Sequence, residues 1–339
     1  MKDNGKTHAL ILIVLFGTLA LAVIISFLLG RYDMTLKQFF QTLFSHFTGI
    51  TPDPVMEKVI FQTRFPRILV AIIIGGGLSI SGAAYQGTFR NPMVSPDLLG
   101  ASAGAGFGAA MAILLSFNHF GIQAMAFLFS ILAVFLSYGI SSAISRTGSN
   151  VLSLVLTGMV VSALFQAFIS IIKYLADPHA ILPAITFWLM GGLASVLNSE
   201  LLILLIPVLI GAVPLFLLRW RMNALSFGDE EARMLGIHPQ RMRIIIILCS
   251  TLITAACVAV GGMISWVGLI IPHLARMIVG PNYRKQLPAS CLLGSIFLLI
   301  VDDVARCLTA SEIPISILTA VIGAPFFLYL LFRGRKSWL

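Results

Sequence analysis

Ten apolar stretches, most of them about 20 residues long, constrain the fold of this chain more than any other feature. A helix needs about 20 predominantly apolar residues to cross the hydrocarbon layer of a membrane. The stretches cover residues 9–29, 66–86, 96–116, 122–144, 151–172, 200–218, 243–261, 265–279, 289–305 and 314–332. Because 265–279 is short, we expect that segment to be tilted or covered by protein.

The charged residues are too few for a soluble protein of this size. They make up 10% of the 339 residues, against about 25% in soluble domains. We therefore predict an all-α polytopic membrane protein in which residues 1–339 form a single transmembrane domain of about ten helices. This composition excludes a soluble enzyme, a secreted disulfide scaffold and a disordered regulator.

The distribution of basic residues predicts the orientation. Lys2 and Lys6 precede the first span and no small-residue cleavage site follows it, so we interpret that span as a retained signal anchor. With ten spans and a cytoplasmic N-terminus, 15 of the 22 Lys and Arg residues fall on the inner side, as the positive-inside rule requires. The C-terminus is then cytoplasmic too. The net charge of +9 reflects orientation, and no nucleic-acid partner is expected.

Several small-residue and cysteine patterns have structural explanations. Residues 182–197 are apolar but interrupted by Pro183 and two glycines, which predicts a re-entrant or partly buried outer segment. The run 104–109 fits G-x-G-x-x-A but lies inside a span, where small residues let helices pack closely. The four cysteines lie in apolar stretches without a C-x-x-C pair, so we expect small core residues.

The polar inner segment 219–242 contains the signal for a helix outside the membrane. Ser226 and Asp229 resemble a capping box, three consecutive acids suit the start of a helix dipole, and Gly236 can end the helix. We predict a short cytoplasmic helix over about 226–236. It is either a plain loop helix or a docking element for a cytosolic partner.

Three arginines on the outer side contradict the positive-inside trend. Arg64 and Arg67 lie at a helix start, where the dipole disfavours cations. They contact lipid headgroups, or they form a basic patch that receives an acidic protein. Arg306 follows Asp302 and Asp303 by four and three residues, so a local ion pair is an alternative to a role in that patch.

The sequence lacks the motifs by which a membrane protein uses ATP or an ion gradient. It lacks the G-x-x-x-x-G-K-[ST] loop that cradles ATP phosphates. Ionisable residues inside the spans are almost absent, whereas a proton- or sodium-coupled carrier usually needs buried carboxylates. We therefore expect transport energy to come from outside the chain.

Four blocks of the sequence form a recognisable pattern. Arg64-Phe65-Pro66-Arg67 fits R-x-P-R, and residues 82–100 look like G-x-x-x-Q followed by R-N-P-L-x-x-P-x-x-L-G, with Met93 in the place of the leucine. Residues 262–276 are similar to G-x-I-x-F-V-G-L-x-x-P-H-x-x-R, and Glu312-Ile313-Pro314 with 323–327 match a closing run. Together, over most of the chain, they resemble the FecCD permease family, the membrane subunits of binding-protein-dependent ABC importers for iron–siderophore, haem and cobalamin.

The resemblance implies a type II ABC importer permease that transports cargo as a homodimer with two ATPase subunits and an extracytoplasmic substrate-binding protein. Arg64, Arg67 and Arg306 match the family positions that meet acidic residues of the binding protein. The segment that couples to the ATPase matches Gly228, Asp229, Glu230, Glu231, Ala232, Arg233, Leu235 and Gly236. The family's cytoplasmic gate falls at 147–153, which makes Thr147, Ser149 and Asn150 candidates. ATP and Mg would bind the partner ATPase subunits, with no catalytic residue, metal site or cofactor in this chain.

Some departures from the family pattern leave the cargo open. Ile315-Ser316 replace the usual Val-Gly, and Trp266 replaces the usual Phe. Residues 177–192 resemble the outer segment of members that include molybdate or tungstate importers, so that cargo is the alternative to an iron chelate. A secondary transporter or a membrane enzyme would need a buried carboxylate or a polar catalytic cluster in the spans, and the sequence indicates neither.

Overall fold

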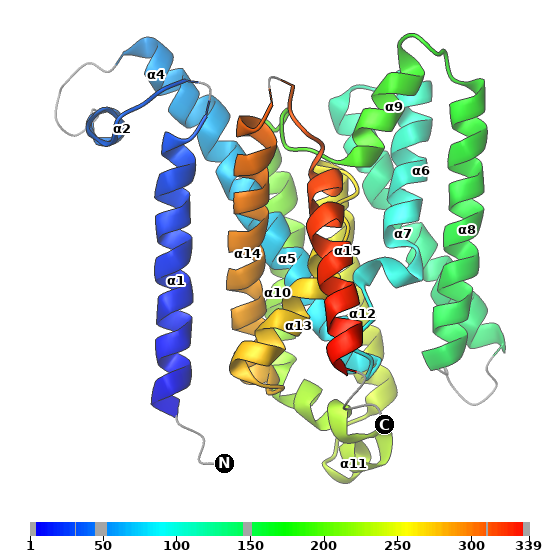
Figure 1. The fold of residues 1–339 in the computed structure, drawn as a ribbon. Helices are drawn as coiled ribbons and strands as arrows, with labels where there is room; N and C mark the ends of the chain where they lie inside the picture. The colour runs from blue at the N-terminus through cyan, green and yellow to red at the C-terminus, as the bar shows by residue number, and fades with distance from the viewer. Residues whose placement is uncertain (1–4, 31, 45–52, 145–150, 310, 335–339) are drawn as a thin grey trace.

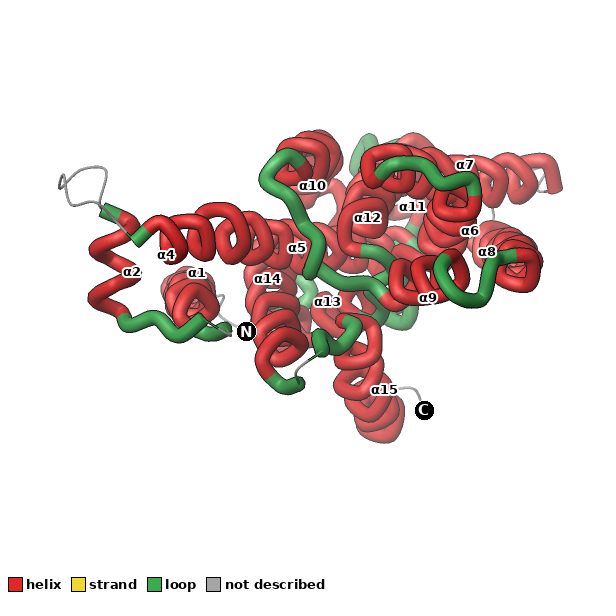
Figure 2. The backbone as a smooth tube through the Cα atoms, turned by 90° about the horizontal axis from the view of Figure 1, so that it is seen from above, coloured by secondary structure: helices red, strands yellow, loops and turns green. Residues whose placement is uncertain are grey.

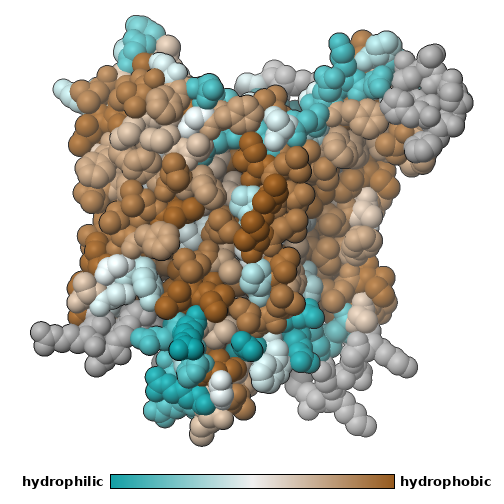
Figure 3. Space-filling model, turned by 180° about the vertical axis from the view of Figure 1, so that it is seen from behind, coloured by the Kyte–Doolittle hydropathy of each residue, from teal (hydrophilic) through white to brown (hydrophobic). Residues whose placement is uncertain are grey.

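The structure is a computed structural model that describes all residues except 1–4, 31, 45–52, 145–150, 310 and 335–339. The described residues form helices and no strands, and seven of these helices are long and apolar enough to cross a membrane. Apolar side chains form a band between two more hydrophilic ends (Figure 3). The prediction of an all-α membrane protein is confirmed.

Each of the ten predicted spans corresponds to a helix. The long ones are α1 (Gly5–Leu28), α5 (Phe65–Thr88), α7 (His119–Ile144), α8 (Val151–Leu175), α10 (Glu200–Phe227), α12 (Pro239–Gly261) and α14 (Tyr283–Cys307). The others are α6 (Ala101–Leu114), α13 (Val267–Val279) and α15 (Ile315–Gly334). The segment 182–197 forms a short helix, α9 (Ile181–Met190), and then an irregular stretch from Gly191. Pro183 lies in the first turn of α9 and does not interrupt it. Most side chains of α9 are half-buried or exposed, which agrees with a partly buried segment.

The bundle has two distinct ends. The start of α1, the end of α15 and the short helix α11 (Asp229–Met234) lie at one end, which we call the α11 end (Figure 1). The end of α14 and the helix α9 lie at the opposite end, which we call the α9 end (Figure 1). The two termini of the helical bundle are therefore on the same side, as an even number of spans requires.

Two predicted spans are shorter helices than a full crossing needs. The span 96–116 begins later than predicted, because residues Pro96–Leu99 form a 3-10 turn, η2, and Gly100 has a φ of 87° before α6 starts. With 14 residues, α6 is about 21 Å long, less than the hydrocarbon core of about 30 Å. The 13-residue α13 packs against α5, α14 and α15, which confirms that this segment is covered by protein.

Helix α5 forms the centre of the bundle. It contacts α10, α12, α13 and α14, and most of its side chains are buried. Glycine permits these crossings: a Cβ atom at Gly75 would overlap the carbonyl oxygen of Gly294, and one at Gly82 would overlap that of Gly268. Neighbouring helices thus touch α5 backbone to backbone.

The other small residues act partly as predicted. Gly104 and Gly108 bring α6 against the backbone of α7, where an added Cβ would overlap carbonyl oxygens, so the G-x-G-x-x-A run is a packing motif. All four cysteines are free. Cys257 is buried as expected, but Cys307 is exposed, because it is the last residue of α14 at the α9 end.

The chain between α1 and α5 forms an arm at the α9 end. It contains α2 (Leu36–Leu43), α4 (Pro54–Lys58) and a π-helical turn, η1 (Val59–Arg64), which continues into α5. Seen along the bundle, α1 is end-on while α2 runs across the view (Figure 2). The arm therefore extends sideways from the bundle and places Arg64 at its junction with α5.

Candidate functional site

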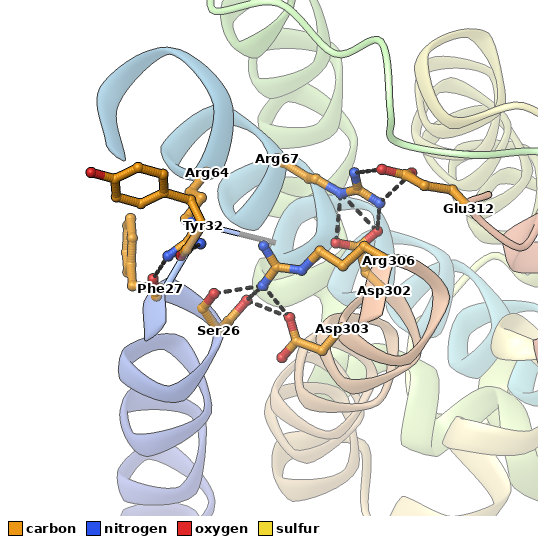
Figure 4. Close-up of polar contacts among 9 residues, drawn as sticks. All are labelled: Ser26, Phe27, Tyr32, Arg64, Arg67, Asp302, Asp303, Arg306 and Glu312. Atoms are coloured by element: carbon orange, nitrogen blue, oxygen red, sulfur yellow. Dashed lines mark hydrogen bonds and ion pairs between the residues drawn. The ribbon is translucent and has the colours of Figure 1, made fainter. Parts of the chain in front are cut away.

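Arg67, in the first turn of α5, is bound by two carboxylates from distant parts of the chain (Figure 4). Its Nε and Nη2 atoms donate to Oδ2 and Oδ1 of Asp302 in α14, each at 2.9 Å. Its Nη1 and Nη2 atoms donate to Oε1 and Oε2 of Glu312, also at 2.9 Å. The side chains of Arg67 and Asp302 are 8% and 0% exposed, and that of Glu312 is 33% exposed. This bidentate geometry is the strong form of an arginine–carboxylate contact.

The other two arginines bind the end of α1 (Figure 4). Arg306 donates from Nη2 to the backbone oxygen of Ser26 at 2.5 Å and to Oδ1 of Asp303 at 2.5 Å. The Ser26 hydroxyl also donates to Asp303, at 2.7 Å. Arg64 donates to the backbone oxygens of Phe27 and, at 2.6 Å, Tyr32. All three arginines are buried.

These contacts fasten α1, the arm, α5, α14 and the α14–α15 connection to one another. The local ion pair predicted for Arg306 is present with Asp303, whereas Asp302 pairs with Arg67 instead. Arg67 and Arg306 pair with three carboxylates, whereas Arg64 donates to backbone oxygens alone. Taken together, the three arginines and the three carboxylates have no net formal charge. The arginines therefore lie at the α9 end of the bundle (Figure 1) as parts of a buried polar network. Whether they also dock a protein stays a prediction.

A cavity of about 370 Å³ adjoins this network at the α9 end. Arg67 and Glu312 line one side, and His119 and Gln123 of α7 line another. The remaining wall comes from α9, the glycine-rich 191–195 stretch, the end of α12 and the start of α15.

A second polar cluster lies behind the cavity and was missed by the sequence reasoning. Glu200, the first residue of α10, is 1% exposed. Its Oε1 accepts from Gln123 Nε2 at 2.7 Å and contacts His119, and its Oε2 accepts from the backbone N–H of Leu197 at 3.1 Å. A lone acid at the border of an apolar run could have flagged it, but its partners on α7 are about eighty residues away.

The short helix predicted for the segment 226–236 is present, with different boundaries. The helix α11 covers Asp229–Met234, and residues 226–227 belong to α10. The capping-box prediction for Ser226 is wrong, because its hydroxyl donates to Asn223 within α10 and Gly228 occupies the N-cap. Gly236, with a φ of 75°, follows the helix end as predicted.

Helix α11 is held to its neighbours on one side and exposes apolar side chains at its end. Asp229 accepts from Arg243 of α12 at 2.6 Å and from Arg90 at 3.4 Å, and Ala232 is fully buried. Met234 and Leu235 are 81% and 57% exposed. Met234 ends α11 and Leu235 follows it, so two exposed apolar side chains are neighbours at the end of this helix.

Other predicted positions give no further site. Thr147, Ser149 and Asn150, the gate candidates, lie outside the described residues. Across the part of the chain that the structure describes, no group of three or more His, Cys, Asp or Glu residues could hold a metal ion.

The all-helical architecture, the central glycine-lined helix and the apolar spans define a multi-span membrane protein. Residues 18–333 match the FecCD transport family, and the chain belongs to that family. It is an ABC importer permease with the type II fold.

The comparisons with individual proteins cover nearly the whole chain. It is 42% identical to the molybdate import system permease protein MolB of Haemophilus influenzae, over 96% of each chain. It is 40% identical to a probable iron chelatin transport system permease protein of Helicobacter pylori, over 93% of this chain and 95% of that protein. A solved structure described as an inward-facing metal-chelate type ABC transporter matches with a TM-score of 0.85 at 40% identity, over 95% and 99% of the two chains.

Proposed function

We propose that two copies of this chain form the pore of an importer that carries a metal chelate or a metal oxyanion into the cytoplasm, driven by two partner ATPase subunits. The α11 end faces the cytoplasm and the α9 end faces outward. The family match over residues 18–333 supports the proposal. The orientation is supported by the difference between the two ends, one with the short helix α11 and the other with the arginine network (Figure 1).

Helix α11 is the proposed contact for the ATPase subunits. Met234 and Leu235 are exposed apolar anchors, while Asp229 connects α11 to Arg243 of α12. A force on α11 would therefore pass directly into a membrane-spanning helix. Gly228, Glu230, Glu231, Arg233 and Gly236 complete the proposed coupling segment.

Co-purification tests this contact. Met234→Glu adds a charge to a side chain that is 81% exposed, so it should leave folding intact and weaken ATPase binding by about tenfold or more. Gln41→Glu adds the same charge to an exposed residue of the arm and serves as the matched control. Tagged variants are purified from native cells in mild detergent and the ATPase subunit is quantified by mass spectrometry. Equal recovery with both variants would refute the contact.

Arg64, Arg67 and Arg306 are the proposed docking residues for an acidic surface of the binding protein. Their burial makes charge reversal a poor test, because it would place unpaired charges inside the protein. Glu312→Gln is better, since it removes the one partly exposed carboxylate that competes for Arg67. The variant should bind the binding protein more tightly, with a steeper loss on adding salt. Unchanged affinity at every salt concentration would contradict docking at Arg67.

The cargo proposal has two branches that one experiment separates. An iron chelate, haem or cobalamin is the first, supported by the 40% identity to a probable iron chelatin permease. Molybdate or tungstate is the second, supported by the 42% identity to a molybdate permease. The binding protein recovered with the permease is titrated with each candidate by calorimetry. Binding of an iron chelate, haem or cobalamin alone would exclude the oxyanion branch, and binding of molybdate alone would exclude the chelate branch.

A further inference from the structure

Helix α2 has three different sides. On a helical projection at 100° per residue, Phe39 and Thr42 form the side that is buried against the protein. Leu36, Phe40 and the C-cap residue Phe44 form the next side, within about 80° of one another, and are 52%, 43% and 48% exposed. The remaining side is polar and exposed; it consists of Lys37, Gln38 and Gln41.

The buried side holds α2 firmly on the arm. Phe39 belongs to a small apolar core with Met34, Met56 and Ile60, and the Thr42 hydroxyl contacts the sulfur of Met56 at 3.1 Å. A capping box between Thr35 and Gln38 starts the helix. The exposed apolar side is thus held in a fixed position by packing on the other side.

The contact between α2 and α1 sets the depth of α2 in the membrane. Helix α1 has 24 residues and is about 36 Å long, slightly more than the hydrocarbon core of about 30 Å. The Phe39 ring lies 5.0 Å from that of Phe27, the residue before the last in α1. Helix α2 therefore lies where α1 leaves the hydrocarbon, and it runs across α1 rather than along it (Figure 2).

Lipid is the occupant that these observations favour. The last turns of α1 expose Leu21 and Ile25, and Leu29 directly after the helix is exposed too. An apolar surface thus continues along α1 to the depth of α2. A helix in the plane of the interface, with apolar residues on one side and polar residues on the other, is the general form of an interfacial membrane anchor. The polar side of α2 then faces water.

We propose that α2 is such an anchor: Leu36, Phe40 and Phe44 insert into the boundary between headgroups and acyl chains at the α9 end. The arm that α2 stabilises also carries Arg64, whose guanidinium donates to the backbone oxygens of Phe27 at the end of α1 and of Tyr32 beyond it. The membrane surface thereby fixes the height of the arm and of its arginine. The anchor does not depend on which cargo the permease carries.

Nitroxide accessibility tests the anchor in the full chain. All variants are made in a Cys307→Ser background, which lacks the exposed cysteine. Labelling of the Cys307→Ser protein itself gives the background signal that is subtracted. Phe40→Cys and Gln41→Cys are then labelled and reconstituted in phosphatidylethanolamine vesicles with a minority of phosphatidylglycerol. The two positions are neighbours in sequence and lie on different sides of the helix, so each controls for the other.

The measured quantity is the ratio of the label's collision rate with oxygen to its collision rate with a water-soluble nickel chelate. This ratio should be several-fold higher for the label at position 40 than for the label at position 41. Equal nickel accessibility at both positions would overturn the proposal. Shielding of position 40 from both reagents would also overturn it, because a second copy or another protein would then cover this side. Leu36→Cys and Lys37→Cys form an independent pair if the substitution of Phe40 prevents folding.

Discussion

Replacing Arg67 with glutamine should destabilise the permease more than most single substitutions. The substitution leaves Asp302, whose side chain is 0% exposed, as a buried carboxylate without its cation. Breaking a buried pair in this way costs about 3–5 kcal/mol. The contact with Glu312 adds little, at most about 1 kcal/mol, because that carboxylate is one third exposed.

A double-mutant cycle separates the ion pair from other effects of the substitution. Arg67→Gln combined with Asp302→Asn leaves no buried unpaired charge, so the double variant should lose less stability than the two single variants summed, by about 0.5–3 kcal/mol. Unfolding is followed by far-UV circular dichroism during titration with sodium dodecyl sulfate in mixed micelles. A loss below about 0.5 kcal/mol for Arg67→Gln, or strict additivity in the cycle, would refute the reasoning.

Three further substitutions probe other contacts by the same titration. Gly82→Ala forces a methyl group into the backbone of α13 and should lower the free energy of unfolding by about 1–3 kcal/mol or more. Its control, Gly17→Ala, adds a methyl group that meets no atom within 4 Å and should be nearly neutral. Equal effects of the two substitutions would contradict the close crossing of α5 and α13. Glu200→Ala leaves buried donors unpaired and should cost about 1–3 kcal/mol; no loss would mean that the cluster is not formed. Asp229→Ala removes the link from α11 to α12 and should cost about 1 kcal/mol while lowering ATPase recovery. Full recovery of the ATPase subunit with this variant would show that the contact between α11 and α12 is not needed for ATPase binding.

The sequence predicted the helices well because long apolar runs are local signals. All ten spans correspond to helices. Of the predicted breaks in 182–197, the glycines end α9, whereas Pro183 lies within its first turn. Boundaries were less predictable where the backbone changes conformation. A proline and a glycine at residues 96 and 100 replace the predicted start of α6 with a 3-10 turn, and the helix α10 continues through Ser226, which removed its predicted role as a cap.

The polar networks could be predicted only in part, because their partners are distant in sequence. The local pair of Asp303 and Arg306 followed from helical spacing. The partners of Arg67 lie 235 and 245 residues away, and only the packing of α5 against α14 brings them together. Glu312 was visible as part of a motif, but its role as an ion-pair partner depends on where the α14–α15 connection lies.

ATP-driven uptake in proteoliposomes tests the central claim most directly. The permease is reconstituted with its co-purified ATPase subunits, ATP is trapped inside or left out, and the cargo-loaded binding protein is supplied on the outside. We expect labelled cargo to accumulate only with ATP, the ATPase subunits and the binding protein together. Accumulation driven by a proton or sodium gradient in vesicles that contain the permease alone would contradict the claim.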